Sequence, residues 1–313
     1  MTEHDAWPDL RHPDAAATLT TLQLWMQIVG KIRTAATPWL NHSWHVPLYV
    51  HAYGLGTGLI PHGGRAFQID LDLRSHRLTL MPTDGEGLTL ALGPMSVAAF
   101  HQHVVGMLEA TGLRVAFHDR PNEMPDATPF RDDDAPRPYD ADFVTSLWRA
   151  LVQAHLVLSE FRTGFLGKAS PVHLFWGAMD LAVTRFSGRP APRHPGGLPN
   201  LPDAITHEAY SHEVSSAGFW PGNADADALF YSYAYPEPAG FRDGAVRPAA
   251  ARYDERLGEF VLPYEAVRTA DDPRATLLAF LQSTYERAAE RGGWDRAALE
   301  CALGEPGRPR PLG

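Results

Sequence analysis

The feature that most constrains the fold is residues 119–142, DRPNEMPDATPFRDDDAPRPYDAD, which carry five prolines and no apolar periodicity. Segments of this composition connect lobes and rarely form helices or strands of their own. The stretch therefore predicts an N-terminal lobe over residues 1–118, an acidic, proline-rich connection over 119–142 and a C-terminal lobe over 143–303. The remaining residues, 304–313, are expected to form a flexible tail.

Helix and strand periods recur in the same order on both sides of this connection. Apolar residues at three- and four-residue spacings predict helices over 15–36, 95–111, 143–161 and 273–291. Alternating and β-branched runs predict strands over 46–53, 66–73, 77–81, 88–92, 113–118, 172–186, 229–235 and 259–262. Residues 187–203 combine prolines with paired glycines, which indicates an irregular loop. We expect this loop to pack near Trp220, with Leu198 and Leu201 as its anchors.

The expected fold is α+β, with two lobes that each contain an antiparallel sheet covered by helices. The halves also read as an internal duplication, because HVPLY (45–49) and HLFW (173–176) open corresponding strands after amphipathic helices. Chance patterning of amphipathic helices explains the same similarity. A true repeat would bring His45 and His173 toward one cleft between the lobes.

The composition is that of a folded globular protein, since 44% of the 313 residues are hydrophobic and 20% are charged. A formal net charge of −10, with no basic run among aromatics, argues against nucleic acid as a partner. No apolar run approaches the roughly 20 residues that span a bilayer, and no signal-peptide pattern opens the chain. We therefore expect a cytoplasmic protein without a membrane partner, in which the single cysteine, Cys301, is structural.

Three short runs place histidine among rigid aromatic side chains: NHSWH (41–45), SPVHLFW (170–176) and YSHE (210–213). Imidazole exchanges protons near neutrality and binds transition metals, so this pattern predicts a pocket for a small molecule. The predicted catalytic residues are His45, His173, His212 and Glu213. The same three histidines are candidate ligands for a divalent transition metal such as zinc or iron, while buried structural imidazoles remain the alternative.

The residues expected to shape the pocket and bind substrate are Trp44, Trp176, Arg185, Tyr210 and Trp220. Aromatic side chains supply rigid walls, and a guanidinium can clamp a carboxylate or phosphate. A salt bridge at the surface is the alternative for Arg185. Asp180, on the strand after Trp176, is a further acid–base candidate.

Familiar catalytic motifs are absent. In HEAYSHE (207–213) the second histidine follows the first by five residues, so the pair cannot share a helix face as a zincin requires. The glycine-rich GLGTG (54–58) lacks the lysine of a P-loop and the spacing of a dinucleotide fingerprint. No G-x-S-x-G elbow occurs in the chain.

Four stretches resemble an uncharacterised bacterial family, a domain of unknown function, over nearly the whole chain. They are GKIRTAATPWLNHSWHVPLYV, SPVHLFWGAMDLAVTRFSGRPAPRHPGGLPNLPD, EAYSHEVSSAGFWPG and FYSYAYPEPAGF. The resemblance implies a family without implying a chemistry. The sequence thus favours a small-molecule enzyme with a His/Trp-lined interlobe cleft, using histidine acid–base or metal chemistry. The alternative is a noncatalytic ligand-binding or scaffold protein.

Overall fold

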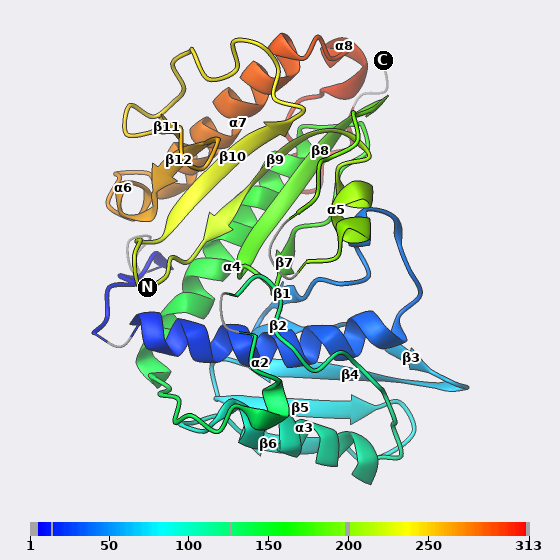
Figure 1. Cartoon of the computed structure of the whole chain (residues 1–313). Helices are drawn as coiled ribbons and strands as arrows, with labels where there is room; N and C mark the ends of the chain where they lie inside the picture. The colour runs from blue at the N-terminus through cyan, green and yellow to red at the C-terminus, as the bar shows by residue number, and fades with distance from the viewer. Residues whose placement is uncertain (1–5, 14, 125–126, 198–200, 311–313) are drawn as a thin grey trace.

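The computed structural model describes residues 6–13, 15–124, 127–197 and 201–310 of the chain. These residues form seven α-helices and two antiparallel sheets of six strands each, one in each half of the sequence (Figure 1). The predicted α+β class with two antiparallel sheets is therefore confirmed. No helix in the described ranges has the length and apolar character needed to cross a membrane.

The first sheet has the order β1-β2-β4-β5-β6, with β3 also paired to β4. Its strands are β1 (Tyr49–His51), β2 (Gly54–Gly56), β3 (Ile60–His62), β4 (Arg65–Asp72), β5 (Arg77–Pro82) and β6 (Leu88–Ala91). The alternation predicted for the central strand places Phe67, Ile69 and Leu71 in the core, where all three are fully buried. The helices α2 (Ala15–Ala36) and α3 (Val97–Ala110) pack together through stacked rings of Trp25 and Phe100, 4.7 Å apart.

The second sheet has the order β11-β12-β10-β9-β8-β7. Its strands are β7 (His173–Phe175), β8 (Asp180–Pro190), β9 (His212–Trp220), β10 (Leu229–Tyr235), β11 (Arg252–Asp254) and β12 (Glu259–Pro263). The helices α4 (Ala141–Thr163) and α7 (Pro273–Arg291) pack on this sheet and on each other. Short helices complete the fold: η1 (Asn41–Ser43), η2 (Phe130–Asp132), α5 (Asp203–Ala209), α6 (Tyr264–Arg268) and α8 (Arg296–Leu299).

A backbone bridge joins the two sheets. Leu48, just before β1, exchanges two backbone hydrogen bonds with Leu174 of β7, at 2.8 and 2.9 Å. The predicted counterparts HVPLY and HLFW therefore lie side by side at the junction of the halves. The sheets differ in strand order, because in the second sheet β12 lies between β10 and β11. The internal duplication therefore stays a prediction.

Several segments differ from the sequence expectations. Residues 113–118 form no strand. Residues 187–190, expected to be irregular, extend β8, and the register shift between Phe186 and Pro190 admits Gly188 at φ 88°. Helix α5 was not predicted, and it begins at the last residue of the expected loop. Of the two predicted loop anchors, Leu198 lies outside the described residues, while Leu201 lines the same cavity as Trp220.

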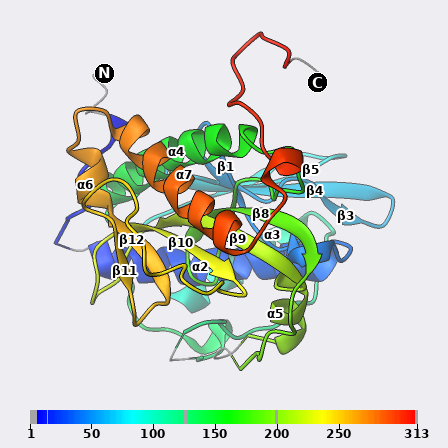
Figure 2. The same cartoon turned by 90° about the horizontal axis from the view of Figure 1, so that it is seen from above.

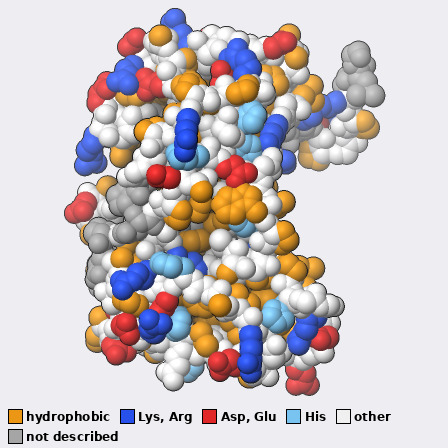
Figure 3. Space-filling model, turned by 45° about the vertical axis from the view of Figure 1, so that its right-hand side comes forward, with side chains coloured by type: hydrophobic (Ala, Val, Ile, Leu, Met, Phe, Trp, Pro, Cys, Tyr) orange, Lys and Arg blue, Asp and Glu red, His pale blue; other side chains and the backbone are white. Residues whose placement is uncertain are grey.

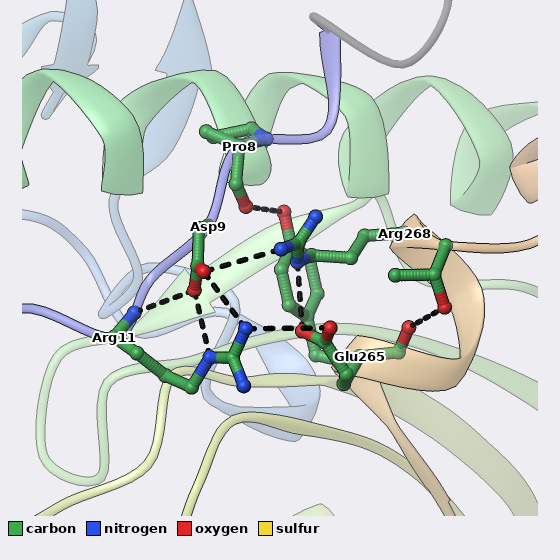
Figure 4. A network of polar contacts seen from close by, with 7 residues as sticks. Pro8, Asp9, Arg11, Glu265 and Arg268 are labelled. Carbon is green, nitrogen blue, oxygen red and sulfur yellow. Dashed lines mark hydrogen bonds and ion pairs between the residues drawn. The ribbon is translucent and has the colours of Figure 1, made fainter.

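The beginning of the described chain packs against the C-terminal half, although the sequence assigned it to the N-terminal lobe. Trp7 is 3% exposed, and its ring lies 6.1 Å from that of Tyr264. The Tyr264 hydroxyl donates to the Pro8 carbonyl at 2.9 Å, and Arg268 pairs with Asp9 at 3.1 Å (Figure 4). Trp7 is apolar and finds its burial against the second sheet, which explains the difference.

At the other end, residues 304–310 lead away from the body of the molecule (Figure 2). All of them are exposed, although the Gly304 N–H donates to Thr163 Oγ1 at 2.8 Å. Residues 311–313 of the predicted tail lie outside the described part of the chain.

Candidate functional site

A cavity of about 1230 Å³ lies between the two halves, and the second sheet forms its floor. The floor side chains are Asp180, Ala182, Thr184, Phe186, Val214, Ser216, Trp220, Leu229, Tyr231, Tyr233 and Glu259. Within β8, β9 and β10 the lining residues are two or four apart, as expected for one face of a pleated sheet. The intervening residues Leu181, Val183 and Phe219 are buried in the core, on the opposite face.

The walls come from the first half of the chain and from α5. Lys31 and Thr34 project from α2, while His42, Ser43 and Trp44 come from the loop around η1. Trp176 lies against α2 at Gly30, where a Cβ would be only 2.1 Å from the indole nitrogen. The indole N–H donates to the Val46 carbonyl at 2.9 Å. On the face shown in Figure 3, hydrophobic side chains gather at the waist between the two halves.

Residues of the acidic connection also reach the cavity. The Gln27 amide, buried on α2, donates to the Asn122 carbonyl at 2.9 Å and accepts from the Asn122 N–H at 2.6 Å. Glu123 follows in the left-handed region, at φ 56°. A Cβ on Gly177 would be 2.1 Å from Glu123 Oε1, so the missing side chain leaves room for this carboxyl group.

Three carboxyl groups at the cavity have pKa values raised toward neutrality. The Tyr231 hydroxyl donates to Asp180 Oδ2 at 2.5 Å, which favours the ionised form, but burial outweighs it and raises the pKa of Asp180 to about 6. Desolvation, followed by the charge of Asp180, raises the pKa of Glu123 and of Glu259 to about 7. Glu123 is accessible from the cavity, so solvent moderates this effect for that residue. The cavity therefore holds groups that can exchange protons at neutral pH.

Hydroxyl groups surround these acids. Tyr210 and Tyr233 share a hydrogen bond of 2.9 Å between their hydroxyls, and burial raises the pKa of Tyr210 to about 12. Thr184 and Ser216, on neighbouring strands, are bonded at 2.8 Å. These pairs add uncharged hydrogen-bonding groups to the floor beside the carboxyl groups.

His173 is the one predicted histidine that lines the cavity. Its Nδ1–H donates to the Pro171 carbonyl at 2.7 Å, which leaves Nε2 as the acceptor nitrogen. Complete burial lowers the pKa of His173 to about 4, so the ring is neutral at pH 7. Such an imidazole can accept a proton or a hydrogen bond from a ligand.

A second histidine at the cavity is His42. The Lys168 ammonium donates to His42 Nε2 at 2.7 Å, so Nδ1 carries the proton that faces the Glu208 carbonyl at 3.1 Å. His42 and Ser43 both have left-handed backbones, with φ of 57° and 59°. Two adjacent non-glycine residues in this region store strain, as is common at functional sites. Burial and the nearby Lys168 charge lower the pKa of His42.

The remaining predicted catalytic residues do not converge with His173. His45 does not line the cavity; its Nδ1 accepts the Leu40 N–H at 3.2 Å, and its ring lies beside Trp39. His212 begins β9 and bonds Ser211, 3.0 Å away. Glu213 pairs with Arg189 at 2.7 Å at the distal end of β8.

Of the predicted substrate-binding residues, Trp44, Trp176, Tyr210 and Trp220 line the cavity. Arg185 does not, because it alternates with Thr184 and so projects from the opposite face of β8. Its guanidinium is buried 3.5 Å from the Phe161 ring centroid and 4.3 Å from that of Tyr285. A ligand in the cavity therefore cannot be clamped by Arg185.

The predicted three-histidine metal site is not formed. Across the described ranges, no three His, Cys, Asp or Glu side chains are grouped so that they could hold a metal ion. A transition metal site would need three such donors to converge at about 2 Å from one point. The polar groups that line the cavity instead include three carboxyls, three tyrosine hydroxyls, His173 and Lys31, and the histidine runs did not reveal most of them.

The fold and the cavity together define a class of protein: a two-sheet α+β molecule with an aromatic-walled cavity between its halves. The chain belongs to DUF5996, a family of unknown function, whose model matches residues 7–301. This confirms the resemblance noted from the sequence. No curated protein and no solved structure matches the chain significantly.

Proposed function

We propose that this protein is a small-molecule enzyme that works by general acid–base chemistry in the cavity between its halves. The observation that carries the proposal is the set of three carboxyl groups, Asp180, Glu123 and Glu259, with pKa values of about 6 to 7 around one aromatic-walled space. Catalytic acids and bases need pKa values near the working pH, and strongly shifted groups in a cavity mark candidate active sites.

The proposed substrate is a mid-sized, largely apolar organic molecule. Binding cavities for such ligands span roughly 300–1,000 Å³ and combine apolar walls with a few polar groups. Trp44, Trp176 and Trp220 supply flat walls, while the Tyr210 and Tyr233 hydroxyls and His173 Nε2 orient polar atoms. In this proposal Asp180, which accepts a hydrogen bond from Tyr231, exchanges a proton with the bound molecule.

Metal chemistry is not part of the proposal, because the predicted ligands do not come together. His45, His212 and Glu213 instead hold loops and strand ends through hydrogen bonds and an ion pair. A noncatalytic binding protein would use the same cavity, so the experiment must separate binding from turnover.

The test begins with a thermal-shift screen of small organic metabolites at pH 7, followed by mass spectrometry of each stabilising compound after incubation with the protein. We expect a stabilising compound to be converted to product, and Asp180→Asn to lower the rate by about 10²- to 10⁴-fold while binding persists. Asp225→Asn, at an exposed turn, is the matched control. Binding without conversion in wild-type protein would favour the noncatalytic alternative.

A further inference from the structure

We propose that Lys31 is a nucleophilic amine that forms an imine with an aldehyde or ketone bound in the cavity. This inference shares its cavity with the proposed function and depends on it in no other way. It identifies the ligand as a carbonyl compound with an apolar or aromatic body.

The first observation is the scarcity and placement of lysine. The sequence has 27 basic residues, but lysine occurs only at positions 31 and 168. Lys31 lines the cavity, and Lys168 donates to His42, which also lines it. A chain that uses arginine for almost every cation thus has one of its two lysines in the cavity wall and the other bonded to a histidine of that wall. Arginine cannot replace an amine that must lose its proton and attack a carbonyl.

The second observation is the environment of the Lys31 amine. Lys31 is 7% exposed, and its Nζ lies 5.5 Å from the centroid of the Trp176 ring. It donates a hydrogen bond to Asn122 Oδ1, a neutral acceptor. None of the ion pairs found among the described residues involves Lys31. Burial in this apolar wall lowers the pKa of Lys31 to about 8, so a useful fraction of the amine is neutral near pH 7.5.

The third observation is that the amine is held in position. Gln27 and Lys31 are four residues apart on α2 and therefore lie on one face of the helix. Gln27 binds both backbone groups of Asn122, and Lys31 binds its side chain. This double attachment fixes Asn122 as a positioning residue and keeps Nζ at the cavity wall.

The chemical step balances without any oxidant or reductant. The nitrogen lone pair attacks the carbonyl carbon, a carbon–nitrogen bond forms, and the resulting carbinolamine loses water. The two amine hydrogens leave with the former carbonyl oxygen, and the carbon–oxygen bond breaks as the carbon–nitrogen double bond forms. Glu123 lines the same wall directly after Asn122, and with a pKa of about 7 it is suited to protonate the departing hydroxyl and then to take back a proton from the iminium nitrogen.

Lys168 provides an internal control. Its Nζ lies 2.7 Å from His42 Nε2 and over the rings of Trp44 and Phe186, at 5.4 and 5.2 Å. Burial lowers the pKa of Lys168 as well, and the charge of Glu208 opposes this effect, but the amine is engaged by the hydrogen bond to His42. Lys168 also does not line the cavity.

The test treats the full-length protein with benzaldehyde and sodium cyanoborohydride at pH 7.5 and compares the two lysine-containing peptides by mass spectrometry. We expect benzylation of Lys31 to be at least about tenfold faster than that of Lys168. In urea-unfolded protein the two lysines should react at similar rates. Equal labelling in the folded state, or a preference that persists after unfolding, would overturn the proposal.

A variant tests the positioning role of Asn122. Asn122→Asp places a carboxylate beside the ammonium, so labelling of Lys31 should slow about tenfold at pH 7.5 and recover at higher pH. A uniform loss of labelling at every pH would contradict this role.

If Lys31 fails to react while Asp180→Asn still abolishes turnover of a screened compound, the imine proposal falls and the proposed function stands.

Discussion

At the residue scale, the sequence identified the aromatic walls better than the reactive groups. Trp44, Trp176, Tyr210 and Trp220 were expected at the pocket and line it. Large rigid rings beside prolines and glycines need a cavity or a core to pack against, so their type is informative without knowledge of orientation. The orientation of shorter polar side chains depends on backbone details that the pattern alone does not give.

Arg185 shows which signal was missed. In DLAVTRF (180–186), Asp180, Thr184 and Phe186 share one face of a strand, and Arg185 must then point the other way. This alternation is visible in the sequence, and it would have separated Arg185 from Asp180. Alternation could not show that His42, and not His45, lines the cavity, because this depends on the left-handed backbone at His42.

Replacing Asp180 should change the pH dependence of stability. Its pKa is about 6 in the folded protein, against an ordinary value of 3.8 that applies once the chain unfolds, so folding binds a proton between these values. The protein therefore loses stability as pH rises from about 4 to 6 through ionisation of this group. We expect Asp180→Asn to raise the free energy of unfolding by about 3 kcal/mol at pH 8 and to change it little at pH 4.

Urea denaturation of both proteins at the two pH values measures this difference. Asn retains an oxygen that can accept the Tyr231 hydrogen bond, so packing should be preserved. A stability change of equal size at both pH values would show that ionisation of Asp180 is not responsible.

Replacing Arg185 should leave ligand binding intact. Its buried guanidinium donates from Nη2 to the Phe161 carbonyl, while Nε and Nη1 have no hydrogen-bond partner among the described residues, and burial lowers its pKa to about 10. Because burying a cation is costly, an apolar side chain of similar length at this position should cost little stability. We expect Arg185→Met to keep binding within about twofold, whereas Ala182→Trp, which fills the floor, should abolish binding of a screened compound. Calorimetric titration compares the two variants.

At the element scale, the long periodic segments were predicted well and the short ones poorly. The four predicted helices correspond to α2, α3, α4 and α7, because three or more turns of apolar periodicity are hard to mistake. Helix α5 and strand β9 were missed because HEAYSHE (207–213) spans the end of one and the start of the other. The mixed segment shows neither period clearly.

Helix α2 also gives a prediction in which two effects oppose each other. Alanine is favoured over glycine inside a helix by about 0.5–1 kcal/mol. At Gly30, however, the new Cβ would lie 2.1 Å from Trp176 Nε1, so the indole must leave the cavity wall. We expect Gly30→Ala to destabilise the protein by about 1–3 kcal/mol and to weaken ligand binding.

Gly106 in α3 is the matched control for this substitution. A Cβ there meets nothing within 4 Å, so Gly106→Ala should stabilise the protein by about 0.5–1 kcal/mol. Denaturant titration of both variants decides the matter. Similar changes in stability from the two substitutions would mean that Trp176 does not pack tightly against α2 at Gly30.

At the scale of the whole molecule, the division into halves explains why the cavity exists. The helix-covered face of the second sheet is packed, while its other face meets the walls supplied by α2, η1 and the connection. Sequence periodicity could predict two sheets, but it could not predict that the second sheet meets these walls. The contacts between the halves join residues more than a hundred positions apart. The backbone pair between Leu48 and Leu174 is one such contact.

The N-terminal segment is the other long-range contact that periodicity could not reveal, and it leads to a prediction about global stability. Trp7 is 3% exposed and packs on Phe230 and Tyr264, with ring centroids 6.3 and 6.1 Å away. The ion pairs nearby, such as Arg11 with Asp9, are exposed and screened by solvent, so they contribute little to stability. Burial of the indole therefore dominates, and we expect Trp7→Ala to lower the free energy of unfolding by about 3–5 kcal/mol.

The control is Trp39→Ala, at a residue that is 54% exposed, which should lower the free energy of unfolding much less. Urea denaturation followed by circular dichroism compares the two, and equal losses would mean that the N-terminal segment does not anchor on the C-terminal half in solution.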